Sequence, residues 1–203
     1  WADGDTGITG EVSSANSLVG GTVGDRVGSH LPSPGGVAIL SNGNYVVSSP
    51  FWQIVFNQRV GAVTWGNGST GVTGVVSAAN SLIGNSTGDM IGLLRQGNPN
   101  PLDGIIPLSD GNYLVASGYW DNGSTPDVGA ITWMNGSQSA SGVVNAANSL
   151  IGSSANDMIG AAHLDVPYDG IVELPNGKFV IASAYWDNGA VQNAGAVTFI
   201  NGA

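Results

Sequence analysis

The sequence has no cysteine, only four lysine and arginine residues, and no long apolar run. Without cysteine there are no disulfides or thiolate metal sites, so a stable fold must depend on an apolar core and on backbone hydrogen bonds. Fourteen acidic residues against four basic ones would repel a phosphate backbone, which argues against nucleic acid as a partner. No stretch approaches the roughly 20 apolar residues that span a bilayer, so membrane insertion is not expected.

Glycine and hydrophobic residues are plentiful. Of 203 residues, 33 are glycine and 42% are hydrophobic, whereas only 9% are charged. Such a chain has enough apolar surface to form a core, unlike disordered polar tracts, and we expect a globular, turn-rich fold. The chain begins at Trp1, with neither an initiator methionine nor a signal peptide, so we expect it to be a piece of a longer protein.

The main feature of the sequence is an internal repeat. The stretch GAVTWGNGSTGVTGVVSAANSLIGNSTGDMIG at 61–92 aligns with GAITWMNGSQSASGVVNAANSLIGSSANDMIG at 129–160, and residues 1–28 give a third copy. A second half recurs as GVAILSNGNYVVSS, GIIPLSDGNYLVAS and GIVELPNGKFVIAS. Equivalent rings at Trp1, Trp65, Trp133 and Phe199 give a period of about 66 residues. The predicted copies are 1–60, 61–128 and 129–194, and a further copy starts at 195–203.

Strand and turn signals dominate each copy. The turns SNGN, SDGN and PNGK place Asn-Gly or Asp-Gly between β-rich runs, which is the strongest short signal for a hairpin. GAVTW predicts a third strand and TGVVSAA a fourth, whereas AANSLIG is too short for a stable helix. Strands that are apolar on both faces, such as NYLVAS, predict sheets that stack face to face.

These signals predict an all-β fold, specifically a β-propeller-like array of three four-stranded repeats. Closed propellers typically have four to eight blades, so three blades of ordinary size do not close a ring. The alternative is a closed form with three sheets, similar to a β-prism. All the length variation between copies falls in one interval, between the conserved-looking Asp-X-X-Gly turn and the hairpin, which we expect to be a surface loop.

Two resemblances follow from these motifs. The order GDMIG, GIIPLSDGNYLVAS and GAITW is similar to the FG-GAP class of propeller blade. The pair GAVTW and VVSAANSLIG resembles the tandem repeats of large bacterial surface proteins of the filamentous-haemagglutinin and adhesin type. The resemblance implies a secreted or surface-displayed array in the extracellular space. The aspartate-rich calcium loop common in FG-GAP blades is reduced here to LSDGN or LSNGN, so we expect no metal and no other cofactor.

A candidate ligand surface recurs in two copies. SGYWDNGS at 117–124 and SAYWDNGA at 183–190 place aromatic rings beside an acid and an amide, the chemistry of a sugar-binding surface, whereas the first copy reads SPFWQIVF at 49–56. The tentative ligand-binding residues are Tyr119, Trp120, Asp121, Asn122, Tyr185, Trp186, Asp187 and Asn188. The same stretch is compatible with a simple turn, in which DNG supplies a glycine at positive φ. In that case the first copy must turn differently, because Ile54 and Val55 are β-branched. We favour the turn.

Two polar positions recur in every copy. Asp25, Asp89 and Asp157 precede an apolar residue and a glycine, and we expect them to accept backbone N–H groups in a turn rather than to bind a metal. The asparagines of the ANSL motif are expected to lock one blade edge to its neighbour; they are Asn16, Asn80 and Asn148.

No catalytic motif stands out, and we expect that the chain is not an enzyme. The sequence has no nucleophile elbow, no paired histidines and no phosphate loop. His30 and His163 fall in the length-variable loop at different repeat positions. The acid pairs Asp165 with Asp169 and Asp103 with Asp110 lie in that region too, which leaves a hydrolase with loop carboxylates as a second alternative.

The leading hypothesis is a non-enzymatic repeat module of a bacterial secreted or surface protein, adhesive or structural in role. Its expected partners are other copies of itself, associating head to tail as a six-blade dimer or a filament, and glycans or a host or matrix surface. The first alternative is a carbohydrate-binding lectin that uses the YWDN surfaces.

Overall fold

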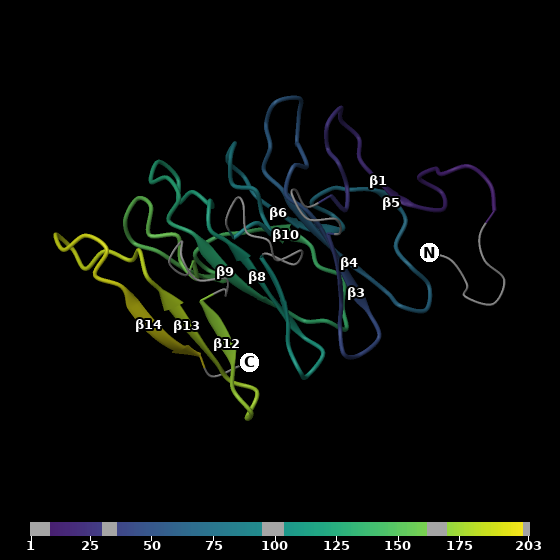
Figure 1. The fold of residues 1–203 in the computed structure, drawn as a ribbon. Coiled ribbons are helices and arrows are strands. Elements are labelled where there is room, and N and C mark those ends of the chain that lie inside the picture. Colours follow the sequence, from purple (N-terminus) through teal and green to yellow (C-terminus); the bar gives the residue numbers. More distant parts are fainter. Residues whose placement is uncertain (1–8, 30–35, 95–103, 162–169, 201–203) are drawn as a thin grey trace.

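The computed structural model describes residues 9–29, 36–94, 104–161 and 170–200, and these residues form only β-strands and turns (Figure 1). The prediction of an all-β fold is confirmed. No helix long and apolar enough to cross a membrane occurs in the described part of the chain.

Three sheets repeat one order of strands along the chain. The first contains β2 (Val37–Ile39), β3 (Tyr45–Ser49), β4 (Ala62–Gly66) and β6 (Ser81–Ile83). The second contains β7 (Ile105–Pro107), β8 (Tyr113–Ser117), β9 (Ala130–Met134) and β11 (Ser149–Ile151). The third contains β12 (Ile171–Glu173), β13 (Phe179–Ser183) and β14 (Ala196–Ile200). Neighbours within these repeated sets pair antiparallel.

The predicted hairpins are confirmed. In the first sheet Leu40 N donates to Asn44 O at 2.8 Å across the SNGN turn, and Leu108 N and Leu174 N make the equivalent bonds to Asn112 O and Lys178 O. The three sheets are separate and follow one another as an open series in Figure 1. Closure into a propeller or a prism therefore stays a prediction.

The fourth strand of each sheet differs from the prediction. In the first two sheets it is the short SLI strand of the ANSLIG motif, β6 or β11, and not the GVV segment. The GVV segments form β5 (Gly74–Val75) and β10 (Gly142–Val143), and each pairs in parallel with the SLI-type strand of the preceding repeat. Strand β5 pairs with β1 (Leu18–Val19), and β10 pairs with β6. The second and third copies thus each lend a strand to the copy before them. A three-residue strand is too short to show a period of two, which is why sequence patterning missed it.

Apolar side chains pack between successive sheets. Val46 and Val63 of the first sheet share a buried cluster with Tyr113 and Val115 of the second. Leu114 and Ile131, on the other face of the second sheet, share another cluster with Phe179 and Ile181 of the third sheet. These four residues occupy the equivalent positions one repeat later. The middle sheet is therefore covered on both faces, as the doubly apolar strands predict. Each such buried aliphatic side chain contributes about 1.5–3 kcal/mol relative to exposure.

Candidate functional site

A buried aspartate joins each sheet to the next. Asp89 is fully buried, and its Oδ2 accepts hydrogen bonds from Asn85 N and Ser86 N, both at 2.8 Å. Its Oδ1 accepts a third bond from Asp121 N at 3.1 Å. Because Asn85 follows β6 of the first sheet and Asp121 follows β8 of the second, one carboxylate holds two sheets together.

The same arrangement occurs in the other copies. Asp25 accepts from Gly21 N and Thr22 N at 2.8 Å and from Gln53 N at 3.1 Å. Asp157 accepts from Ser153 N at 2.7 Å, from Ser154 N at 2.8 Å and from Asp187 N at 2.9 Å. The prediction that these are turn aspartates is confirmed, and the third bond, which spans two sheets, adds a linkage that the turn signal did not indicate.

Burial dominates the electrostatics of this linkage. It raises the pKa of the Asp89 carboxyl above its ordinary value, although the N–H donors of Ser86, Asn85 and Asp121 act to lower it. Burial also raises the pKa of Asp127, with a smaller contribution from the nearby Asp121 carboxylate. Both oxygens of Asp89 accept hydrogen bonds from backbone N–H groups, so this carboxylate has a structural role.

The YWDN stretches form a turn in the second and third copies. Asn122 N donates to Thr125 O at 3.0 Å, Thr125 N donates back at 3.1 Å, and Gly123 between them has a φ of 64°. Asp121 Oδ1 accepts from Asp127 N at 2.9 Å and so closes the base of the turn. The third copy repeats this geometry: Asn188 pairs with Val191, Gly189 has a φ of 61°, and Asp187 Oδ1 accepts from Asn193 N at 2.7 Å.

The first copy turns differently, as predicted. Gln53 stands where the other copies have aspartate, and its Oε1 accepts from Asn57 N at 2.7 Å while its Nε2 donates to Val23 O at 2.8 Å. The positive φ, 68°, now falls on Asn57. The guanidinium of Arg59 lies 5.7 Å from the centre of the Phe51 ring, a cation–π contact that the YWDN copies lack the residues to make.

The aromatic residues of the stretch do not form an open platform in the second copy. Trp120 is only 2% exposed and belongs to the apolar cluster between the first two sheets, and its Nε1 has no hydrogen-bond partner in the described part of the structure. Tyr119 and Asp121 are half-buried, and Asn122 is exposed. The Trp120 ring therefore acts as core, and sugar binding at this loop stays a prediction without a stacking face.

The third copy is more open. Trp186, Tyr185 and Asp187 are half-buried, and Asn188 is exposed. A polar hollow of about 160 Å³ lies against this loop; it is lined by Ala155, Asn156, Tyr185, Asp187, Gln192 and Asn193. Two of the predicted ligand-binding residues thus line one hollow.

The recurring asparagines bond within their own segment, which corrects the expectation that they lock neighbouring blades. Asn80 Oδ1 accepts from Ser77 N at 2.9 Å, and its Nδ2 donates to Val75 O at 3.0 Å. Asn16 and Asn148 make the same pair of bonds. An asparagine that satisfies both a donor and an acceptor three and five residues earlier closes a local turn, and it thereby shapes the segment that reaches the preceding sheet.

Other candidate residues add little. Asp110 is exposed and accepts from Asn112 N at 2.9 Å within its hairpin turn. Several predicted candidates lie outside the described residues: Asp103, Asp165, Asp169, His30 and His163. Where the structure describes the chain, no group of three histidine, aspartate or glutamate side chains is placed to hold a metal ion.

Comparison with known proteins places the repeat in a family. No curated protein and no solved structure gave a match to the chain. A family model described as a repeat of unknown function (DUF5650) matches residues 1–29, 39–93, 107–161 and 173–203. Each of the two longest matches runs from a hairpin to the loop after the SLI strand, so the family's unit corresponds to one sheet, in a different phase from the predicted copies. The matches cover most of the sequence, and the chain therefore belongs to this family of repeats of unknown function.

Proposed function

We propose that the chain is a non-enzymatic repeat module of a secreted or surface-displayed bacterial protein, with a structural or adhesive role. The observation that carries this proposal is that the recurring aspartates and asparagines all bond to the backbone. Asp25, Asp89 and Asp157 link sheets, the recurring asparagines close local turns, and Asp121 and Asp187 close the YWDN turns. A catalytic site instead requires acid or base groups directed at a substrate.

In this proposal the sheets are the blades of a propeller-like or prism-like array. The face-to-face packing of two successive sheet pairs supports it, as does the likeness of the GDMIG, hairpin and GAITW order to FG-GAP blades. The resemblance of the repeats to those of bacterial adhesins supports the surface location. Arrays whose units contact only their neighbours are suited to extended display.

Turnover assays test the proposal. The purified chain is incubated with panels of polysaccharides, chromogenic glycosides and esters, and no hydrolysis is expected. Any hydrolysis that persists on repurification and is lost in Asp103→Asn or Asp169→Asn would contradict the proposal and support the hydrolase alternative. Glu11→Gln serves as the control, because Glu11 is an exposed carboxylate outside the length-variable loops.

Glycan binding at the third YWDN loop is a second candidate. It rests on the polar hollow that contains Tyr185, Asp187 and Gln192. At about 160 Å³ this hollow is smaller than ordinary ligand pockets of roughly 300–1,000 Å³, so it suits part of one sugar ring. On a glycan array, binding should disappear in Asp187→Ala and persist in Asp121→Ala. The Asp121→Ala variant is the control because it loses the equivalent turn bond in the loop whose tryptophan, Trp120, is buried. Equal loss in both variants would remove this candidate.

A further inference from the structure

An apolar pocket of about 320 Å³ lies between the second and third sheets. Its apolar lining comes from Leu114, Ile131, Trp133, Ala147, Leu150, Phe179, Ile181 and Ile200. Between the first and second sheets the fully buried Val144 packs into the cluster that the equivalent positions form. The equivalents are Val46, Val63, Trp65, Ala79, Leu82, Tyr113, Val115 and Met134, and all but Ala79 belong to that same cluster. The pocket is therefore the position that the second valine of a GVV segment fills.

Val12 occupies the position of the second GVV valine in the first repeat, and no sheet in the described part of the chain covers it. It aligns with Val76 and Val144, which are 2% and 0% exposed, yet Val12 itself is 82% exposed. Its segment already has the docked conformation. Asn16 accepts from Ser13 N and donates to Glu11 O, both at 2.9 Å, as Asn148 does with Asn145 N and Val143 O. The φ of Gly10, 107°, equals that of Gly142.

The strands on either side of the pocket have matching open edges. Among the described residues, β11 pairs only with β9, whereas β6 also holds the GVV strand β10 on the edge opposite β4, and β1 pairs with the GVV strand β5. β14 likewise pairs only with β13. In the complete sheets the strand at β14's position also pairs with an SLI strand, and the hydroxyls of Thr64 and Ser81 meet at 2.7 Å across that pair. The residues left to repeat this contact are Thr198 on β14 and Ser17, next to β1.

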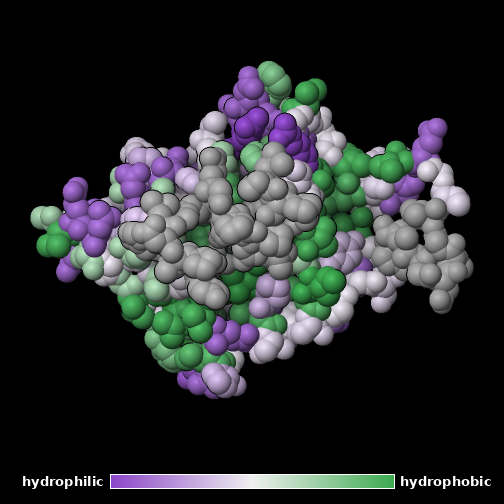
Figure 2. All heavy atoms as spheres, viewed as in Figure 1, coloured by the Kyte–Doolittle hydropathy of each residue, from purple (hydrophilic) through white to green (hydrophobic). Residues whose placement is uncertain are grey.

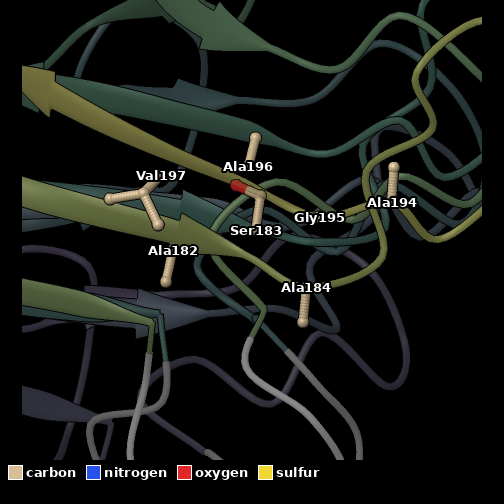
Figure 3. Close-up of a pocket in the computed structure, with 7 residues that line it drawn as sticks. All are labelled: Ala182, Ser183, Ala184, Ala194, Gly195, Ala196 and Val197. Carbon is tan, nitrogen blue, oxygen red and sulfur yellow. The ribbon is translucent and has the colours of Figure 1, made fainter.

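A second hollow repeats the pattern. Gly61 and Gly129 lie so close to the backbones of Ile91 and Ile159 that an added Cβ would collide with them. At the equivalent Gly195 the nearest atom, Ala184 O, would be 3.6 Å from a Cβ, and an open hollow of about 350 Å³ adjoins it (Figure 3). Val27, which aligns with Ile91 and Ile159, is the residue that would cover this glycine.

The outer face of the third sheet is also apolar and uncovered. Val172, Val197 and Phe199 are all more than half exposed, and Figure 2 shows hydrophobic residues gathered over this part of the molecule. Their equivalents in the first sheet, Ala38 and Val63 among them, are buried against the second sheet. On the opposite end of the series, Val37 and Ile39 of β2 are exposed. The two ends are thus complementary halves of the contact that the inner sheets make.

From these observations we propose that residues 10–27 of a second molecule of this chain complete the third sheet of the first molecule. Residues 10–12 lie parallel to β11 with Val12 in the apolar pocket, β1 pairs antiparallel with β14, and Val27 covers Gly195. The proposal rests on the proposed structural role and specifies its partner and register. Hydrophobic burial drives the contact, and the extra strands satisfy open backbone groups, as in β-augmentation.

Sedimentation equilibrium on a matched pair of variants tests the proposal. The 203-residue chain is expected to associate in a concentration-dependent way between about 1 μM and about 1 mM. Val12→Asp should weaken association at least about 100-fold, since an unpaired carboxylate is costly to bury. Val23→Asp is the control: Val23 is equally exposed, at 82%, but its equivalents Thr87 and Ala155 stay exposed in the inner copies. A monomeric wild type, or equal loss in both variants, overturns the proposal.

Disulfide trapping tests the register independently, since the chain has no native cysteine. Under mild oxidation Ser17→Cys with Thr198→Cys should give covalent dimers and higher ladders, because the equivalent hydroxyls in two inner pairs are 2.7 Å apart. Ser17→Cys with Val197→Cys is off by one residue, so its side chains lie on opposite faces and it should give few. Equal yields from both pairs overturn the register.

These outcomes separate this inference from the function on which it rests. Circular dichroism of Val12→Asp should match the wild type, because Val12 is exposed in the single chain. A chain that is folded, monomeric and without turnover contradicts only the association. A chain with carboxylate-dependent hydrolysis contradicts the proposed function, whatever its mass. Residues 1–5 align in sequence with residues 199–203 of the other molecule. A chain that lacks residues 1–5 should therefore associate at least as tightly as the full chain, and weaker association overturns the proposal.

Discussion

At the scale of single residues, the buried aspartates carry the connection between sheets. Each is buried and accepts hydrogen bonds from three backbone N–H groups, so its removal takes away three bonds at once. The position was predictable from its recurrence before an apolar residue and glycine. Its bond across two sheets was not, since Asp89 and Asp121 are far apart in sequence and only the packing of the sheets brings them together.

The first prediction concerns Asp89. Replacing it with alanine removes a buried acceptor that three backbone N–H groups share, so the free energy of unfolding should fall by about 1–3 kcal/mol. Asp110→Ala, in an exposed turn, should lower it by less than about 0.5 kcal/mol. Urea denaturation measures both. Equal losses would mean that the bond across the sheets contributes nothing.

The second prediction concerns pH. Burial raises the pKa of Asp89 in the folded chain above its ordinary value of 3.8, so the folded state binds this proton more tightly than the unfolded state. The stability contributed by this group is therefore fully present below pH 3.8 and is lost as pH rises through the raised folded pKa. Asp89→Asn does not titrate, so the unfolding free energy of the wild type relative to this variant should increase on acidification. A decrease on acidification would show that the three hydrogen bonds outweigh burial.

At the scale of elements, the hairpins and the YWDN turn followed from local chemistry. Asn-Gly and Asp-Gly pairs indicate hairpin turns, and the β-branched Ile54 and Val55 indicated that the first copy turns differently. Two features were not predictable. The SLI strand has three residues and no period, and the partner of the GVV strand lies in another copy, which no local pattern specifies. The sequence left the place of Trp120 open between core and ligand platform, and the structure shows it buried in the core.

The third prediction concerns the turn. Asp121→Ala removes the acceptor for Asp127 N, so it should lower the free energy of unfolding by about 0.5–2 kcal/mol, the range for losing a side-chain cap. Asn122→Ala, at an exposed neighbour, should change it by less than about 0.5 kcal/mol. Thermal or urea unfolding decides between them. Unchanged stability in Asp121→Ala would show that the bond to Asp127 N does not stabilise the turn.

At the scale of the whole molecule, the structure is a series of sheets that share strands and core with their neighbours. The sequence predicted the series and its face-to-face packing from the repeat and the doubly apolar strands. Ring closure depends on the small rotation between sheets, which is a property of the packed array and not of any motif. The repeat therefore specifies contacts between neighbours more firmly than it specifies overall shape.

The fourth prediction concerns metal. The hairpin turns lack the roughly six to eight oxygen ligands that calcium takes, so the melting temperature should not change when a chelator is added. Differential scanning calorimetry with and without EDTA checks this. A fall of more than about ten degrees would exceed the shift expected from about 1 kcal/mol in a domain of this size and would reveal a structural ion.

The most direct test of the account is hydrogen exchange, because its central claim is that buried contacts join successive sheets into one cooperative unit. Under native conditions the amides of β3 and β8 should open with the same free energy, and Asp89→Ala should lower both together. Opening free energies that differ between the two strands, or a variant that lowers only one of them, would show that the sheets fold independently and would contradict the account.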